Sequence, residues 1–338
     1  MKTLYHFPIT NKASFRKVIV VFVALFTICS VTSIAQTTEL HLASDIWPPF
    51  TDVKGEKSIA IDLVSEAISR IDIKPNVEIL DFKVVLPGVI TGKYDGSSAM
   101  WITDERKENM LFSKPYLNNQ LIIVGRKGSD VSASSMDDLK GKRIGIVDNY
   151  AYGLNSDDYI LISEESDQKN LSRLLSNEID YMLVDAILIQ YLVQYQLNDV
   201  TEFLEIGSKP LMVKPLHFVL NKNVKNADQI IASFDKEIEK MIADGTYNRI
   251  LEFNWISADI DGDGKMELIL QGNKAGTKAP DQAYSIHANN TLAKSQSERY
   301  HIEGQTYYGW DSVPQQYKTD IVMGSQNLKN SGIRLNFK

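Results

Sequence analysis

The order of short apolar segments and amphipathic helical segments along residues 39–255 constrains the fold more than any other feature of the sequence. Apolar residues recur at helical spacing in several places, beginning with Ile61, Val64, Ala67, Ile68 and Ile71. Four apolar runs have the length of buried strands and are bounded by glycine or polar residues: 121–124, 144–147, 182–184 and 216–220. This alternation of strands and helices predicts an α/β fold.

The sequence also predicts more than one compact unit. Between Gly125 and Asp138 the chain is polar and rich in small residues, which predicts a crossing between two units. A second crossing is predicted near Lys214 and Pro215. The length of the chain also indicates more than one unit, because it exceeds the size at which a single hydrophobic core usually stops growing.

Residues 1–35 have the three parts of a secretory signal peptide. Four basic residues and no acid precede the apolar run at 18–28. Ser33 and Ala35 are small residues at the positions before a cleavage site. The apolar run is shorter than the ~20 residues of a membrane-spanning helix, so a retained anchor is the weaker alternative. Cys29 leaves a lipoprotein signal as a further alternative. The sequence therefore predicts export to the periplasm, with no membrane span after cleavage.

The predicted exported chain is acidic and lacks cysteine. Removal of residues 1–35 leaves 32 of the 36 basic residues against 43 acidic ones, a formal charge of −11. Such a chain is poorly suited to bind nucleic acid, whose phosphates require a basic surface. Cys29 is the only cysteine, so the exported chain would have no disulfide, no thiolate metal site and no cysteine nucleophile.

The composition changes again after Trp255. Residues 256–338 are rich in glycine, asparagine, glutamine and tyrosine, and hydrophobic residues alternate with polar ones at 266–270 and 300–308. This pattern predicts a small β-rich module that is separate from the α/β units. Disorder is the alternative, although the many aromatic residues between 300 and 317 favour a folded module.

Several segments resemble those of a known family, and they occur in the same order. They are Trp-Pro-Pro-Phe at 47–50, Ile-Asp-Leu at 61–63, Ile-Thr-Asp-Glu-Arg at 102–106 followed by Phe-Ser-Lys-Pro-Tyr at 112–116, Leu-Lys-Gly-Lys-Arg-Ile-Gly at 139–145, and Asp-Gly-Thr-Tyr at 244–247. Together they resemble the family 3 solute-binding proteins of ABC transporters, which include periplasmic binding proteins for polar amino acids.

This resemblance implies a fold and a set of boundaries. The fold is the type II periplasmic binding protein-like fold, in which two α/β lobes are joined by a two-strand hinge and the ligand lies between them, at the carboxyl ends of strands. Residues 36–126 and 215–255 would then form lobe 1, and residues 127–214 would form lobe 2. Residues 256–338 would form the β-rich C-terminal extension.

The resemblance also implies ligand-binding residues. Arg106 matches the family arginine whose parallel N–H donors bind a carboxylate. Asp185 matches the acid that receives the ammonium group, Trp47 matches the aromatic residue that covers the ligand side chain, and Ser98 falls near a polar lining position. The residues alone leave alternatives open. Arg106 could cap its helix or pair with Asp104 or Glu108. Asp185 could cap a helix, and Trp47 could belong to the core.

Two aromatic residues depart from the family pattern. Trp101 stands where relatives often have a small hydroxyl residue, and Tyr150 lies in a segment, 149–152, that replaces the usual Gly-Thr or Gly-Ser turn. We expect both side chains to narrow the cleft or to stack on a flat or cyclic ligand. An amino-acid derivative or another small carboxylate is therefore the alternative to an α-amino acid.

An acidic loop follows the α/β region. Its carboxylates at Asp259, Asp261, Asp263 and Glu267, with the backbone carbonyl of Lys265, have the alternate spacing of oxygen ligands around Ca²⁺. The loop resembles the Asp-x-Asp-x-Asp-Gly loops of integrin-like β repeats. A structural Ca²⁺ is thus predicted in the C-terminal extension, with a solvated acidic turn as the alternative. No cofactor is predicted for the two lobes.

Together these features predict a binding protein and not an enzyme. The protein would capture a small ligand bearing a carboxylate by hinge closure, deliver it to an ABC permease and act as a monomer. A dehydratase-like enzyme acting on a cyclic carboxylate is one alternative, although no acidic pair can be assigned as its general acid. A sensing or docking protein, whose C-terminal module contacts a partner, is the other.

Overall fold

The structure, a computed structural model, describes residues 38–155, 157–189, 200–252, 255–270, 275–280, 282–285, 292–294 and 297–319. The predicted signal peptide, residues 1–35, lies outside the described residues, as does part of the predicted C-terminal extension. Within the described ranges, no helix has both the length and the apolar sequence that crossing a membrane requires.

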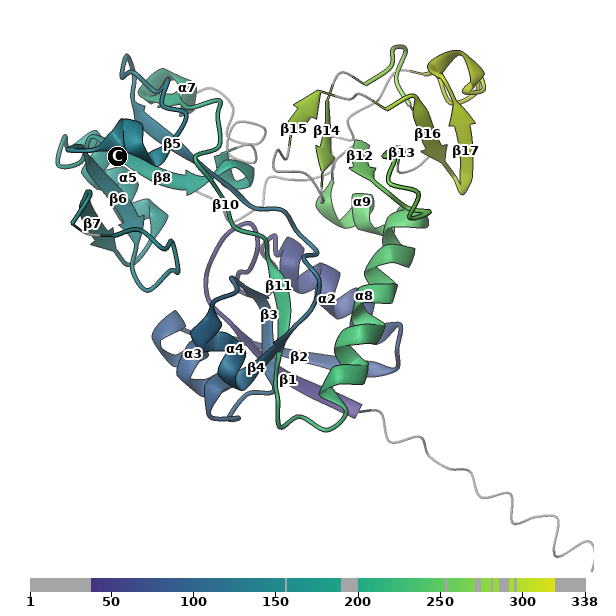
Figure 1. Ribbon diagram of the computed structural model, residues 1–338, viewed down its shortest axis with the longest axis horizontal. Helices are drawn as coiled ribbons and strands as arrows, with labels where there is room; N and C mark the ends of the chain where they lie inside the picture. The colour runs from purple at the N-terminus through teal and green to yellow at the C-terminus, as the bar shows by residue number, and fades with distance from the viewer. Residues whose placement is uncertain are drawn as a thin grey trace, which may run out of the picture. The chain divides into compact units, whose positions relative to one another are not determined.

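The first of three sheets combines an early part of the chain with one later strand (Figure 1). Its order is β2-β1-β3-β11-β4, in which β1 is parallel to β2 and β3, and β11 is antiparallel to β3 and β4. The strands are β1 (Thr38–Ser44), β2 (Ile73–Ile79), β3 (Gly96–Met100), β4 (Met110–Phe112) and β11 (His217–Asn221). The chain therefore leaves this sheet after β4 and returns to it at β11.

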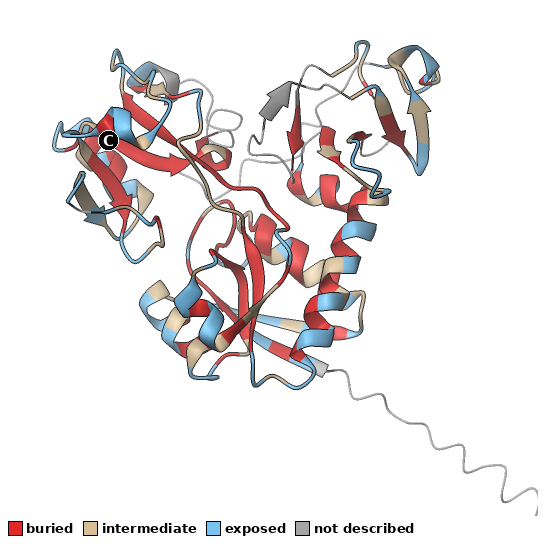
Figure 2. Cartoon of the chain, in the orientation of Figure 1, coloured by how far each residue is buried: buried red, intermediate tan, exposed pale blue. Residues whose placement is uncertain are grey.

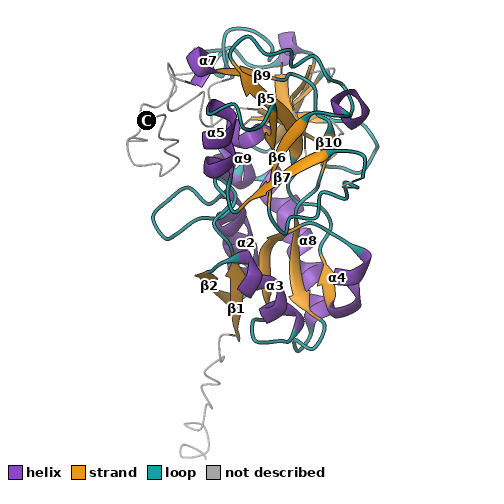
Figure 3. Ribbon diagram, turned by 90° about the vertical axis from the view of Figure 1, so that its left-hand side faces the viewer, coloured by secondary structure: helices purple, strands orange, loops and turns teal. Residues whose placement is uncertain are grey.

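Helices cover both faces of the first sheet, and the alternation of side chains along β11 shows why (Figure 3). Phe218 and Leu220 join the large core beneath two helices that pack on each other, α2 and α8, whereas Val219 joins a smaller core beneath α3. The helices that accompany this sheet are α2 (Ile59–Ser69), α3 (Phe82–Ile90), α4 (Asp104–Asn109), α8 (Ala227–Ala243) and α9 (Thr246–Leu251).

The second sheet is formed by the part of the chain between β4 and β11. Its main order is β10-β5-β8-β6-β7, and β9 also pairs with β5. The strands are β5 (Gln120–Arg126), β6 (Arg143–Val147), β7 (Ile160–Glu164), β8 (Tyr181–Asp185), β9 (Leu204–Ile206) and β10 (Met212–Val213), with η1 (Met136–Leu139), α5 (Asp167–Leu175) and α7 (Val200–Phe203) beside them. Figure 2 shows β8 buried along its whole length, like β3 and β11. The four predicted apolar runs fall in β5, β6, β8 and β11.

The first crossing between these sheets lies earlier than the sequence predicts. Because β5 pairs with β8 in the second sheet, the chain crosses at residues 113–119, before β5, and not between Gly125 and Asp138. There it runs beside the returning segment, with an antiparallel bridge between Leu117 and Leu216. The prediction was wrong because an apolar strand does not reveal which sheet it enters. The polar stretch after Gly125 is a surface turn at the far end of β5.

The third sheet is made by the C-terminal part of the chain. Its order is β15-β14-β12-β13-β16-β17, and its elements are β12 (Trp255–Ala258), β13 (Glu267–Leu270), β14 (Gln282–Ser285), β15 (Leu292–Lys294), β16 (Arg299–Ile302), β17 (Gln305–Tyr308) and η2 (Trp310–Ser312). On one face, Trp255 and Tyr300 pack in a separate small core. On the other, Ile256 and Tyr284 join the core of the α/β region. The predicted β-rich module is therefore present, and it shares a buried face with the rest of the protein.

Candidate functional site

Aromatic side chains gather at the carboxyl ends of strands from two sheets. Trp47 follows β1, Trp101 follows β3, and Tyr150 and Tyr152 follow β6. The ring centroids of Trp47, Trp101 and Tyr150 lie 5.2 to 5.5 Å from one another, and Tyr152 lies 5.3 Å from Trp101. This edge of an α/β sheet is where such folds bind ligands, because the loops that follow the strands converge there. The structure thus brings together Trp47, Trp101 and Tyr150, as the sequence predicts.

Arg106 is buried beside these rings without an ion-pair partner in the described part of the chain. It lies on α4, whose first turn is capped by the Thr103 hydroxyl. One guanidinium nitrogen, Nη1, donates to the carbonyl of Trp101 at 2.7 Å, and the group lies 5.5 Å from the centre of the Phe82 ring. Asp104, a partner considered from sequence, instead pairs with Lys107. Burial lowers the pKa of Arg106, and a buried cation of this kind is costly unless an anion joins it.

Asp185 is buried at the end of β8 and is bound by two uncharged donors. The indole N–H of Trp47 donates to Oδ2 at 2.7 Å, and the amide nitrogen of Asn119 donates to Oδ1 at 2.5 Å. Burial raises the pKa of the Asp185 carboxyl, and these two hydrogen bonds oppose that shift. Trp47 was predicted to cover a ligand side chain, and here its indole N–H is bound to Asp185, the predicted acceptor of the ligand ammonium.

Two further carboxylates border the aromatic cluster. Asp45 directly follows β1 and accepts a hydrogen bond from the Tyr150 hydroxyl at 3.0 Å. Burial raises the pKa of Asp45 to about 6. Asp167 begins α5, and its pKa is raised by burial and by the nearby charge of Asp185. All three acids therefore bind protons more readily than free aspartate does.

The aromatic rings leave little space between these groups. The remaining cavity is about 20 Å³ and is bordered by Asp45, Trp47, Phe82, Ala99, Met100, Trp101, Arg106, Tyr150 and Ala151. That is room for about one water molecule, which needs ~10 to 15 Å³ of such space, and it is far too small for an amino acid. Entry of an amino acid would therefore require the rings or the two sheets to move apart, which a hinge between them permits.

Two predicted residues do not border this cavity: Asp185, which is bound to the indole of the lining residue Trp47, and Ser98. Ser98 is fully buried within β3, and its hydroxyl oxygen has no hydrogen-bond partner among the described residues. Its carbonyl accepts a hydrogen bond from the Tyr116 hydroxyl at 2.6 Å. The neighbouring Ala99 borders the cavity instead, and sequence spacing could not distinguish these two positions.

Several residues of the site were missed in the sequence. Asp45 and Asp167 carry a usable signal, since each is an acid directly after a strand or at the start of a helix. Lys214 has none: its ammonium donates to the carbonyl of Ala151 at 2.9 Å and lies 5.8 Å from the Trp101 ring. Asn119 also carries no sequence signal of its role, because its contact with Asp185 joins residues 66 positions apart.

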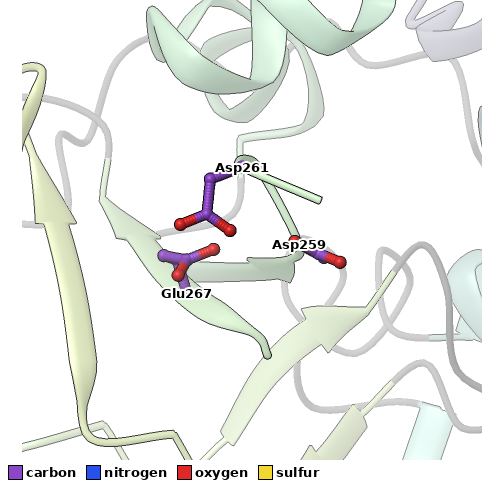
Figure 4. Close-up of side chains that lie close together, drawn as sticks. All are labelled: Asp259, Asp261 and Glu267. Atoms are coloured by element: carbon purple, nitrogen blue, oxygen red, sulfur yellow. The ribbon is translucent and has the colours of Figure 1, made fainter. Parts of the chain in front are cut away.

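The acidic loop brings three of its five predicted ligands together. One carboxylate oxygen from each of Asp259, Asp261 and Glu267 lies within 4.8 Å of the other two, and Figure 4 shows the Asp261 side chain extending toward Glu267. Asp263 is not part of this group of carboxylates. Asp263 instead forms an ion pair with Arg299 at 2.7 Å, and Arg299 also contacts Glu267 at 2.8 Å and Asp261 at 3.7 Å.

Comparison with known proteins places residues 40–257 in one family. The matching model describes bacterial extracellular solute-binding proteins, family 3. The chain is 28% identical over 215 residues to the probable amino-acid-binding protein YxeM of Bacillus subtilis (strain 168), covering 60% of this chain and 78% of that protein. It is 27% identical over 252 residues to the putative amino-acid ABC transporter-binding protein PatH of Vibrio harveyi, covering 72% and 97%.

Solved structures agree with the fold. An ancestral arginine-binding protein bound to arginine is 26% identical, with a TM-score of 0.53 over 63% of this chain and 96% of that one. The periplasmic binding protein of an arginine 3rd transport system from Legionella pneumophila is 25% identical, with a TM-score of 0.54 over 64% and 98%. These matches support the type II periplasmic binding protein-like fold of two lobes and a hinge. Strands β13–β17 lie beyond the residues that the family model matches.

The raised pKa of Asp45 predicts how the stability of the ligand-free protein depends on pH. The folded state holds this proton more tightly than the unfolded state, so the contribution of Asp45 to stability is present at low pH and is lost as the pH rises through about 6. Asp45→Asn imitates the protonated group. Compared with the parent, we expect this variant to be more stable by at most about 1 kcal/mol at pH 4.5 and by at most about 3 kcal/mol at pH 7.5, because the loss begins near the unfolded pKa of 3.8 and amounts to ~1.4 kcal/mol per pKa unit.

Chemical denaturation at the two pH values measures this difference, with the exposed Asp157→Asn as the control. A stability difference between parent and Asp45→Asn that does not change with pH would contradict the prediction.

Proposed function

The chain belongs to family 3 of the bacterial extracellular solute-binding proteins, and we propose that it captures an amino acid with a cationic side chain in the aromatic cleft, by closure about its two crossing segments. One observation carries the proposal: Arg106 is a buried guanidinium without an ion-pair partner among the described residues, at the carboxyl ends of the strands. A ligand carboxylate would supply the missing anion and accept two parallel hydrogen bonds.

The balance of charges supports a cationic ligand. Two cations, Arg106 and Lys214, and three carboxyl groups, Asp45, Asp167 and Asp185, lie around the aromatic rings, and of these Arg106 and Asp45 border the cavity. A ligand ammonium would bind Asp185 in place of the Trp47 indole, and a second cationic group would bind near Asp45, against the faces of the aromatic rings. Proteins whose names describe arginine or histidine binding are among the relatives.

The physiological setting follows from the same proposal. We infer that the protein is exported to the periplasm by residues 1–35, acts as a monomer and passes its ligand to an ABC permease. Relatives named as components of amino-acid ABC transporters support this inference.

A dehydratase activity is the second candidate. The raised pKa values of Asp167 and Asp185 support it, since a general acid must hold a proton near neutral pH. A further neighbour in structure, 20% identical, is described as an ancestral amino-acid-binding protein that preceded a cyclohexadienyl dehydratase, and at that identity it supports the fold alone. Recovery of an unchanged ligand after incubation would favour binding, and formation of a product would favour the enzyme.

We also propose that the acidic loop is a structural calcium site. Asp259, Asp261 and Glu267 provide hard oxygen ligands at a spacing that suits Ca²⁺. Arg299 already neutralises part of this loop, so the ion and the guanidinium would be alternative partners of the same carboxylates. The loop also borders a cavity of about 520 Å³ that Lys114 and Pro215 of the crossing segments line as well.

The first prediction of this proposal concerns the carboxylate. Arg106→Ala should weaken binding of arginine, lysine or histidine by about 2 to 5 kcal/mol, or ~30-fold or more, because it removes the partner of a buried ligand carboxylate. Titration calorimetry measures the affinity, and Lys107→Ala, an exposed cation next on the same helix, is the control. An unchanged affinity in Arg106→Ala would exclude this residue from the ligand site.

The second prediction concerns the ligand side chain. Asp45→Asn should lower the affinity for arginine and lysine about 10-fold or more, because it removes a charged partner, and should leave glutamine binding nearly unchanged. The selectivity ratio from calorimetry is the readout, and Asp104→Asn, an exposed acid near Arg106, is the control. Equal losses for cationic and neutral ligands would show that Asp45 does not recognise the side chain.

The third prediction concerns calcium. Millimolar Ca²⁺ should raise the unfolding temperature, because extracellular sites of this type bind with dissociation constants of ~0.1 to 1 mM. Arg299→Gln should bind Ca²⁺ more tightly than the parent, and Asp261→Asn should not bind it measurably. Calorimetry with Ca²⁺ and with Mg²⁺ tests this, with Asp311→Asn as the control. Absence of any heat of calcium binding in both the parent and Arg299→Gln would refute the site.

A further inference from the structure

The C-terminal sheet reaches one of the segments that cross between the first two sheets. Tyr284 of β14 is buried, and its hydroxyl accepts a hydrogen bond from the backbone N–H of Asn118 at 2.8 Å and donates to the carbonyl of the same residue at 3.2 Å. The side-chain amide of Asn118 in turn donates to the carbonyl of Ser285 at 3.3 Å. Two consecutive residues of β14 therefore hold the backbone and the side chain of Asn118.

The position of Asn118 makes this contact important for hinge motion. Leu117 bridges the returning segment at Leu216, and the N–H of Lys214 donates to the carbonyl of Asn119 at 2.8 Å. Asn118 thus lies between the two points at which the crossing segments are hydrogen bonded to each other. Motion about these segments would change the backbone of Asn118, which Tyr284 holds.

The buried surroundings of Tyr284 keep its hydroxyl group protonated. The Tyr247 hydroxyl donates to the backbone carbonyl of Tyr116, and all three tyrosines are fully or almost fully buried. Burial raises the pKa of each of these phenols. Tyr284 is therefore neutral at physiological pH and can both donate and accept a hydrogen bond, as its contacts with Asn118 require.

Asn119, the next residue, is directly bound to the candidate ligand site. Its amide nitrogen donates to Asp185, and its amide oxygen is buried without a hydrogen-bond partner in the described ranges. A buried amide oxygen in this state is costly, and an N–H donor would relieve the cost. The ammonium group of an amino acid has three such donors, of which Asp185 would take one or two.

We propose that Asn119 is a further ligand-binding residue, whose amide oxygen accepts an N–H from the ligand ammonium beside Asp185, and that Tyr284 of the C-terminal sheet is its positioning residue. This inference rests on the proposed binding of an amino acid at Asp185. It gives the C-terminal sheet a role in the affinity of the cleft, through Asn118 and the backbone that Asn118 shares with Asn119. No contact of the C-terminal sheet with the ligand itself is needed.

A double-mutant cycle tests the inference in the full-length protein. Tyr284→Phe removes only the hydroxyl, and should weaken arginine binding about 3- to 10-fold, the loss expected for one or two neutral hydrogen bonds. Asn119→Ala should weaken it at least as much. If Tyr284 acts through Asn119, adding Tyr284→Phe to Asn119→Ala should cause no further loss. The control is Tyr300→Phe, a buried tyrosine in the other core of the same sheet, which should bind like the parent.

A measurement without ligand separates this inference from the proposed function. The Asn119 hydrogen bond lowers the pKa of Asp185, so Tyr284→Phe and Asn119→Ala should both raise the Asp185 titration midpoint in carboxyl NMR, while Tyr300→Phe leaves it unchanged. The titration must be read together with Asp167, Tyr150 and Tyr152, the titratable groups that face Asp185.

The outcomes are distinct. Loss of affinity in Tyr284→Phe with no further loss in the double variant, and a raised Asp185 midpoint, support the inference. Parent-like affinity and midpoint in Tyr284→Phe, or independent and additive losses, overturn it. If the parent protein binds no amino acid, the proposed function fails along with the ligand-binding role of Asn119, and a raised Asp185 midpoint would then support only the positioning of Asn119 by Tyr284.

Discussion

The hydrogen bonds of Asp185 are the interaction on which the rest of the site depends. This carboxylate is buried at the end of a central strand of the second sheet, and its donors in the described part of the chain are both uncharged. One donor, Trp47, comes from a loop of the first sheet, and the other, Asn119, comes from a crossing segment. A single buried acid thus joins both α/β sheets and the segment between them. Burying its negative charge without a cation is unfavourable, and this free-energy cost remains unless a cation replaces one of the neutral donors.

A second buried charge, that of Arg106, also lies near the aromatic rings. Arg106 is a buried cation without an ion-pair partner among the described residues, while the nearby Asp45 holds its proton more tightly than a free acid does. The proposed ligand, with a carboxylate and one or two ammonium or guanidinium groups, would supply a partner to both buried charges at once. These groups are buried beside the aromatic rings, which would strengthen each charge pair with a ligand. We therefore expect closure over the proposed ligand to be favourable, because Arg106 of one lobe and Asp185 of the other would each gain a charged partner.

The parts that were predictable from sequence are those set by local pattern. Periodicity located β5, β6, β8 and β11 but could not assign β5 to its sheet, since an apolar strand suits either one. The family resemblance identified Arg106 and Trp101 as site residues, because a recognisable sequence segment contains the first and directly follows the second. It could not identify Asn119 or Arg299, whose partners lie 66 and 32 or more positions away. Contacts of this kind depend on how elements pack, and neither spacing nor propensity encodes them.

The C-terminal sheet is best understood through the thermodynamics of closure. A two-lobed protein binds its ligand in proportion to the fraction of molecules that already have the competent arrangement. Hydrogen bonds from Tyr284 to the backbone of Asn118 raise the free energy of any arrangement that breaks them. If they persist only in the arrangement described here, they favour it before any ligand arrives. A sheet added beyond the family region can therefore change affinity without lining the cleft, because it acts on the short segment that both α/β sheets share.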